Sequence, residues 1–251
     1  MKTRYVGNNL SAYLNLEIHS QNLDVETISE EANVDKTYLT QLFQGYTRLS
    51  YNSQLVRVVN YLNLDESDIF KRNLQFEKTR NQFYDAFFYC LDEKVRLYGE
   101  VISYSNTLSS SAYSVDILLI DYIFTVTQAK DFSKMGLLSE MVIRIFDSLS
   151  PYYQKLYLVF YLYHLIYLSK FEKILDYFEL TKKICCKDKQ LNGRLYYIGF
   201  SIYRCLGQVE QAKMCFFSAT RIFKEINNIA MLENLNMKYS SLLRSIGSLK
   251  E

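Results

Sequence analysis

The sequence predicts an all-α protein. Its 251 residues include one proline and eight glycines, so few positions favour a chain reversal, and good helix formers dominate. Apolar side chains recur at the three- and four-residue spacing of a helix face over most of the chain. An apolar fraction of 49% supports a sizeable core, and the length suits two domains, 1–72 and 73–251. The net charge of +2 predicts neither a strongly basic nor a strongly acidic partner surface.

Two short helices open the chain's clearest pattern. Over 25–32, Val25, Ile28 and Ala32 share one helix face, and the four-residue connection 33–36 follows. We expect Asp35 to cap a second helix and Gly45 to end it. The apolar positions predicted to close this small core are Leu39, Leu42, Phe43, Leu55, Val58, Val59 and Leu62.

The opposite face of the second helix is polar. Such side chains can reach phosphates, base edges or thymine methyl groups when a helix lies in the major groove. The candidate DNA-binding residues on this helix are Lys36, Thr37, Tyr38, Thr40, Gln41 and Gln44. We therefore expect double-stranded DNA as a partner.

The segment ISEEANV at 28–34 and the helix after it resemble the Cro/cI type of helix-turn-helix domain, over about the first 70 residues. Asn33 stands where that family has a turn glycine, and asparagine also tolerates a left-handed backbone. The resemblance implies that Lys36, Thr37, Tyr38, Thr40 and Gln41 face the groove. It also implies that Arg48, Asn52 and Arg57 lie near the DNA backbone.

The charge of this region supports an alternative. Residues 1–72 hold seven Lys/Arg and nine Asp/Glu, whereas strong operator binders are usually basic. The helices could form a small bundle without any nucleic acid. Dimerisation would help a weak reader, because two joined half-site readers gain effective concentration.

Consecutive helices are expected beyond residue 73. Their approximate ranges are 74–107, 113–129, 134–148, 151–168, 171–184, 189–206, 209–226 and 229–246. Turn positions Lys130, Ser169, Gly207 and Gly247 recur at steps of 39, 38 and 40 residues, which predicts an array of helical hairpins.

The unit 193–226 resembles the tetratricopeptide repeat at its large, small, aromatic and alanine positions. These positions are Tyr196, Gly199, Phe200, Tyr203, Gly207, Ala212, Phe216 and Ala219. The unit before it, 155–188, keeps the period with fewer signature residues. The resemblance implies a tetratricopeptide-like superhelix whose concave face holds an extended peptide.

A short peptide ligand would then contact polar positions of two successive first helices. The candidate peptide-binding residues are Arg194, Tyr197, Ser201, Arg204, Asn234, Met237, Ser241 and Arg244. Arginine suits a carboxylate, and asparagine can pair with both groups of a peptide backbone. The alternative is that these are solvated polar faces of amphipathic helices.

The last helix has no second helix after it in the sequence, so its apolar face needs cover. We expect homodimerisation through Leu232, Leu235, Tyr239, Leu242, Leu243 and Ile246. The segment 65–80 between the domains can continue as helix and would act as the hinge.

The order of the two domains resembles the RNPP group, the peptide-pheromone receptor regulators of Gram-positive bacteria and their phages, which includes the arbitrium receptors. The resemblance implies a cytoplasmic, dimeric transcription regulator in quorum sensing or phage lysis–lysogeny that senses a short peptide. Two alternatives stay open: a helical-repeat adaptor for a protein partner, and a repressor without a peptide ligand.

The sequence lacks the motifs that are typical of enzymes, metal sites and membrane spans. No GxxxxGK, GxGxxG, HExxH or GxSxG string occurs, and His19 and His164 fall in different predicted domains. The five cysteines form no CxxC pair, so we expect neither a zinc site, a disulfide framework nor any cofactor. The longest apolar run, 156–168, is too short to span a bilayer.

Overall fold

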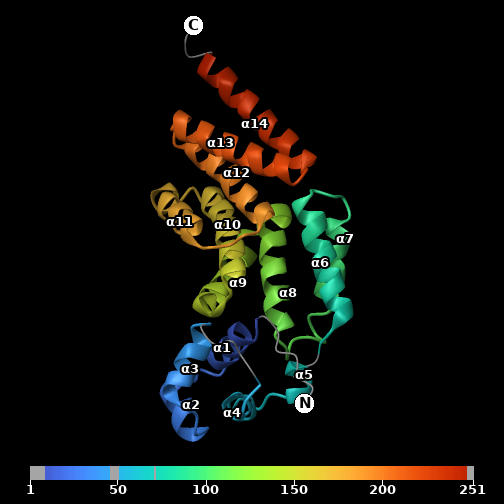
Figure 1. Cartoon of the computed structure of the whole chain (residues 1–251), viewed down its shortest axis with the longest axis vertical. Coiled ribbons are helices and arrows are strands. Elements are labelled where there is room, and N and C mark those ends of the chain that lie inside the picture. Colours follow the sequence, from blue (N-terminus) through green and yellow to red (C-terminus); the bar gives the residue numbers. More distant parts are fainter. Residues whose placement is uncertain (1–8, 46–50, 71, 248–251) are drawn as a thin grey trace. The chain divides into compact units, whose positions relative to one another are not determined.

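The computed structural model describes residues 9–45, 51–70 and 72–247, and its regular elements there are all helices (Figure 1). The predicted all-α class is therefore confirmed. The α-helices are α1 (Leu10–Ser20), α2 (Val25–Glu31), α3 (Lys36–Phe43), α4 (Ser53–Tyr61), α5 (Glu66–Ile69), α6 (Leu74–Phe88), α7 (Lys94–Ser103), α8 (Tyr113–Phe124), α9 (Phe132–Arg144), α10 (Pro151–Tyr167), α11 (Phe171–Lys183), α12 (Lys189–Cys205), α13 (Val209–Glu225) and α14 (Ile229–Gly247). A π-helix, η1 (Thr125–Ala129), extends α8, and a 3₁₀ turn, η2 (Phe146–Ser148), follows α9.

The chain forms two compact units. One contains residues 1–83 and 95–154, and the other contains residues 84–94 and 155–251. The division falls inside α6 and α10, so each of these helices contributes to both units. The segment 1–72 thus shares its unit with α7, α8 and α9.

Side-chain caps fix the starts of the N-terminal helices. The Asp24 carboxylate accepts a hydrogen bond from the Thr27 N–H at 2.8 Å, and Asp35 accepts one from Tyr38 N–H at 2.8 Å. Asn52 caps α4 in the same way through the Leu55 N–H at 2.8 Å. These bonds satisfy backbone donors that have no partner within the helix, and the predicted cap at Asp35 is confirmed.

Left-handed residues end many of these helices. Asn22, Asn33 and Asn63 have φ between +51° and +55°. In each case the next N–H reaches a carbonyl five residues back, as Val34 N–H does to the Ser29 carbonyl at 3.1 Å. This arrangement satisfies the last carbonyls of the helix. Asparagine at position 33 therefore takes the backbone conformation expected of it.

Left-handed residues also lie at the turns between the later helices. Lys130, Ser169 and Gly207 have φ of +54°, +54° and +71°, which confirms three of the predicted turn positions. Gly247 is the last residue of α14, and the residues after it lie outside the described part of the chain.

The structure corrects the long helix expected over 74–107. α6 ends at Phe88 because Cys90 is left-handed, with φ +59°, and the Leu91 N–H bonds the Ala86 carbonyl. α7 then begins at Lys94. The predicted hinge is not one helix either: α5 ends at Ile69, and Asn73 caps α6 by accepting from the Phe76 N–H at 2.9 Å.

Small residues allow close packing in the second unit. A Cβ on Gly199 would lie 2.7 Å from the Phe178 ring of α11 and 3.0 Å from Cys215 Sγ of α13. Ala212 and Ala219 are fully buried on α13. The small side chains at these positions therefore let the neighbouring helices pack closely.

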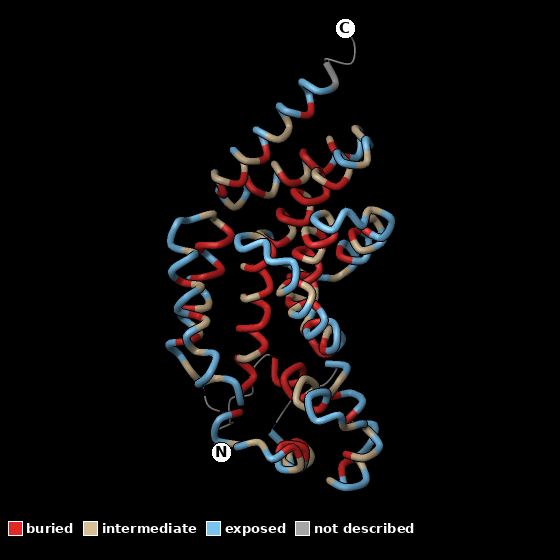
Figure 2. The backbone as a smooth tube through the Cα atoms, turned by 180° about the vertical axis from the view of Figure 1, so that it is seen from behind, coloured by how far each residue is buried: buried red, intermediate tan, exposed pale blue. Residues whose placement is uncertain are grey.

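The first unit is built around α8. In Figure 2 this helix is coloured as buried along most of its length, and nine of its twelve residues are buried. One of those nine is the acidic residue Asp116, which is 3% exposed. A buried carboxyl group needs partners, and these define part of the candidate site.

Candidate functional site

The exposed face of α3 is continuous and polar. Lys36, Thr37, Thr40, Gln41 and Gln44 are all exposed, whereas Leu39 and Leu42 are completely buried. On a helix of 3.6 residues per turn these five polar positions fall within one arc of about 140°. The predicted reading face is therefore available to a partner, with Tyr38 at its margin, half-buried.

The one cation on this face already has a partner. Lys36 Nζ forms an ion pair with Glu26 of α2, and both side chains are exposed. The hydrogen bond from Lys36 lowers the pKa of Glu26, and that with Glu26 raises the pKa of Lys36. A phosphate at Lys36 would have to displace this carboxylate, so the ion pair opposes binding of a polyanion here.

The surroundings of α3 are acidic. Within residues 24–45, Lys36 is the only Lys or Arg, against five Asp or Glu. Glu26, Glu30 and Glu31 are all exposed. Of these three carboxylates, Glu26 contacts Lys36 directly.

Two of the remaining predicted DNA contacts, Asn52 and Arg57, stabilise the local fold. Asn52 caps α4 and accepts a hydrogen bond from the Tyr38 hydroxyl at 3.4 Å. Arg57 Nη1 donates to the Asn33 carbonyl at 2.7 Å, which holds the turn between α2 and α3. Arg48 lies outside the described residues.

Other helices of the first unit hold the C-terminal end of α3. The Ser11 hydroxyl donates to the Leu42 carbonyl, and the Ser148 hydroxyl of η2 donates to the Phe43 carbonyl. Asn15 Nδ2 donates to Ser148 Oγ at 2.7 Å. Gly45 lies close to the backbone of η2, because a Cβ on it would be 3.1 Å from the Ser148 carbonyl oxygen. These contacts fix α3 against η2.

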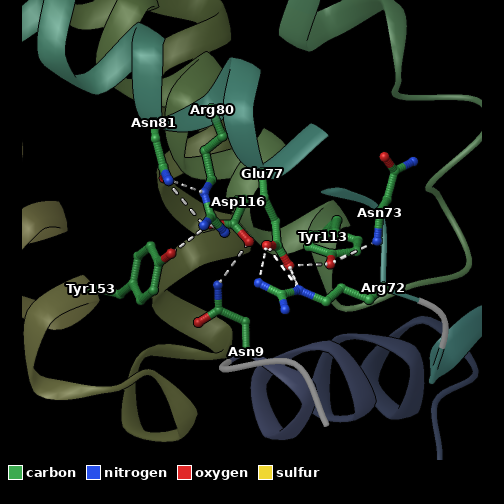
Figure 3. A network of polar contacts seen from close by, with 9 residues as sticks. All are labelled: Asn9, Arg72, Asn73, Glu77, Arg80, Asn81, Tyr113, Asp116 and Tyr153. Atoms are coloured by element: carbon green, nitrogen blue, oxygen red, sulfur yellow. Dashed lines mark hydrogen bonds and ion pairs between the residues drawn. The ribbon is translucent and has the colours of Figure 1, made fainter. Parts of the chain in front are cut away.

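A second set of bonds ties the start of α1 to the helices around Asp116 (Figure 3). The Asp116 carboxylate accepts from Arg80 Nη1 at 3.2 Å, the Tyr153 hydroxyl at 2.5 Å and Asn9 Nδ2 at 3.3 Å. Burial raises the pKa of Asp116, while Arg80 and the two hydrogen-bond donors act against this shift. The network links α6, α8, α10 and the residue before α1.

Glu77 of α6 extends the network. Arg72 pairs with it through two nitrogens, at 2.8 Å for Nη2 and 3.0 Å for Nε, and the Tyr113 hydroxyl donates to it at 2.8 Å. The hydrogen bond from Arg72 is the main cause of a lowered Glu77 pKa. Sequence reasoning missed both carboxylates. A signal existed for Asp116, because it interrupts the apolar run of α8.

The second unit gives Arg194 a structural role. This residue is 7% exposed, and its Nη2 donates to the Phe87 and Phe88 carbonyls at 3.0 and 3.2 Å. Its guanidinium group also lies over both phenylalanine rings. A cation at a helix C-terminus is favoured by the helix dipole, so Arg194 caps α6. Its assignment to an open peptide groove is therefore corrected.

A lysine that sequence reasoning missed occupies part of the predicted peptide face. Lys238 Nζ of α14 donates to Ser201 Oγ at 3.1 Å and lies 4.3 Å from the ring centre of Tyr197, which is buried. Burial, followed by repulsion from Arg204, lowers the pKa of Lys238. Tyr197 and Ser201 are thus covered by Lys238 rather than open.

The other predicted peptide contacts remain accessible. Arg204, Met237, Ser241 and Arg244 are exposed, and Asn234 is half-buried. Arg204 and Lys238 take part in none of the ion pairs found among the described residues.

The predicted dimer face of α14 packs within the protomer. Leu235 and Leu242 are buried, and the Tyr239 ring stacks on Phe216 with 3.9 Å between ring centres. Leu232 is half-buried, Leu243 is 48% exposed, and the Ile246 side chain lies outside the described set. The assignment of Leu235 and Leu242 to a surface between copies is corrected, because α13 already covers that side.

No protein-family model matches the chain, and no curated protein matches its sequence. Within the described ranges, no helix is both long and apolar enough to cross a membrane. No group of three His, Cys, Asp or Glu side chains in the same ranges could hold a metal ion.

Proposed function

We propose that the protein is a DNA-binding transcription regulator that reads duplex DNA with the exposed face of α3. The observation that carries this proposal is the continuous arc of Lys36, Thr37, Thr40, Gln41 and Gln44 on a helix whose other side is buried. These side chains can pair with phosphates and base edges in the major groove. The helix-turn-helix resemblance of residues 28–45 adds support.

Selection from a randomised duplex library tests the proposal. The full-length protein, incubated at low salt, should enrich a defined sequence over successive rounds. Low salt is used because contacts between cationic side chains and phosphates release counterions and are strongest there. A library that shows no enriched sequence would contradict DNA reading and leave the helical-repeat adaptor as the better account.

Dimerisation belongs to the proposed mechanism, because one short helix contacts few base pairs. Large apolar side chains remain exposed on the second unit, with Met214 at 70% and Phe217 at 61% on α13. We place the dimer surface at these residues, since such side chains favour contact between proteins.

Phe217→Ser should lower the molar mass found by light scattering. Phe132→Ser, which changes a phenylalanine exposed by 52% on α9, is the matched control.

A short peptide is the proposed ligand of the second unit. Lys238 lies at Ser201 and Tyr197 on the predicted peptide face, repulsion from Arg204 contributes to its lowered pKa, and neither cation joins an ion pair among the described side chains. A peptide carboxylate would relieve that repulsion.

Thermal-shift assays with short peptides should show stabilisation by free C-termini and none by the same peptides with amidated C-termini. Arg204→Ala should abolish the shift, and a shift that survives this change would move the site elsewhere.

A further inference from the structure

Two adjacent cysteines lie in the connection between α11 and α12. Cys185 is exposed and Cys186 is half-buried. The backbone around them is held at two points: the Ile184 carbonyl accepts from Lys155 Nζ at 3.2 Å, and the Cys186 carbonyl accepts from Asn192 Nδ2 at 2.9 Å. The proposed DNA and peptide functions use none of these residues.

Lys155 is an unusual neighbour for this pair of thiols. It is 3% exposed on α10, and it joins no ion pair within the described ranges. Its pKa is lowered by burial, and the groups that oppose this shift are the thiols of Cys186 and Cys185. A buried ammonium group without a carboxylate partner is costly. Its Nζ bonds the Ile184 carbonyl at 3.2 Å, directly before the two cysteines, so a thiolate formed at this site would offset its charge.

We propose that Cys185 and Cys186 form a redox-modification site at which a hydroperoxide converts the two thiols to a vicinal disulfide. Lys155 acts as the positioning residue. Its ammonium group lies where it would attract a thiolate, which is the nucleophilic form of cysteine.

The chemistry proceeds in two steps. The Cys186 sulfur attacks one peroxide oxygen, so an S–O bond forms, the O–O bond breaks, and the leaving oxygen takes up a proton. The Cys185 sulfur then attacks the sulfenic sulfur, so the S–S bond forms and the hydroxyl departs as water. The dithiol loses two electrons and two protons, and the peroxide gains them.

The product should be reduced easily. Adjacent Cα atoms lie about 3.8 Å apart, whereas relaxed disulfides need about 4.4–6.8 Å. Such a strained bond is the labile, regulatory kind. Its formation would twist the peptide between Cys185 and Cys186 and move the carbonyls that hold Lys155 and Asn192. The link between α11 and α12 would loosen as a result.

Peroxide treatment of the full chain followed by peptide mapping tests the site. Cleavage after Lys183 and Lys187 releases both cysteines in one peptide that contains none of the other three. We expect this peptide to lose two hydrogens and to regain them with a thiol reductant. Cys205 is the internal control, because it is also exposed but has no adjacent cysteine. A 184–187 peptide that stays reduced while Cys205 is oxidised would overturn the proposal.

Two variants separate the roles of the residues. Cys185→Ser changes an exposed side chain, and it should replace the disulfide by a Cys186 sulfenic acid that a cyclic diketone traps. Lys155→Met keeps the side-chain length, and it should slow oxidation severalfold in protein whose thermal unfolding remains cooperative. An unchanged oxidation rate in Lys155→Met, or no trapped sulfenic acid in Cys185→Ser, would contradict the mechanism.

Discussion

Glu26 forms an ion pair with Lys36 across the turn that joins α2 and α3. The pair places a negative charge beside the only cation on the exposed face of α3. The same contact that ties the two helices together therefore also competes with any phosphate for Lys36. The proposed DNA binding is expected to depend on that competition.

Glu26→Gln should raise the affinity for the selected duplex severalfold, because it removes the competing charge and leaves a side chain of the same size. Glu140→Gln is the control, since Glu140 is an exposed carboxylate of α9. Fluorescence anisotropy with labelled duplex measures both. An equal gain in the two variants would show that net charge, rather than the ion pair, limits binding.

Gly199→Ala should destabilise the second unit by about 1–3 kcal/mol, because the added methyl overlaps the Phe178 ring and Cys215 Sγ. Gly136→Ala is the matched change, since no atom lies within 4 Å of a Cβ at that site on α9. It should instead be neutral or stabilise by up to about 1 kcal/mol. Urea unfolding gives the free energy of unfolding of both variants. Similar changes in Gly199→Ala and Gly136→Ala would refute the close approach of Gly199 to Phe178.

Arg194→Met should cost about 2–3 kcal/mol of stability, because the Phe87 and Phe88 carbonyls lose their buried donor. Arg204→Met changes an exposed arginine on the same helix and should stay within about 0.5 kcal/mol of the parent. The free energy of unfolding is measured in urea. If Arg204→Met loses as much stability as Arg194→Met, the loss in Arg194→Met does not come from the cap on α6.

Glu77 should make stability depend on pH in the acid range. Arg72 lowers its folded pKa below the ordinary value of about 4.3, so its contribution is complete above that pH and is lost as the pH falls through the folded pKa. Glu77→Gln should therefore be less stable than the parent at neutral pH and should lose less stability on acidification to about pH 3. Unfolding curves at the two pH values test this, with Glu140→Gln as a carboxylate that joins no ion pair among the described residues. If Glu77→Gln and the parent lost equal stability on acidification, Glu77 would not be the source of the pH dependence.

Local patterns predicted the helices well wherever neighbours in sequence determine them. The caps at Asp35 and Gly45, and the left-handed turns at Lys130, Ser169 and Gly207, need only nearby backbone groups. The break at Cys90 was missed because cysteine is not a typical left-handed residue.

Contacts between distant segments could not be derived in this way. Arg194 shares a helix face with Tyr197 and Ser201, but the end of α6 covers it from more than a hundred positions earlier in the chain. Leu235 and Leu242 look like an uncovered stripe in sequence, whereas the structure buries them. Helical spacing shows which residues share a face and does not show what covers that face.

The most direct test of the central claim is a comparison of two double variants on the selected duplex. Thr37→Ala/Gln41→Ala removes side chains from the exposed face of α3, and Thr107→Ala/Gln128→Ala removes the same two types from exposed positions of the first unit outside α3. The first variant should weaken binding by about tenfold or more, since each good base contact is worth about 1–3 kcal/mol, and the second should bind as the parent does. Equal affinities for the parent and the Thr37→Ala/Gln41→Ala variant would contradict the claim that α3 reads DNA.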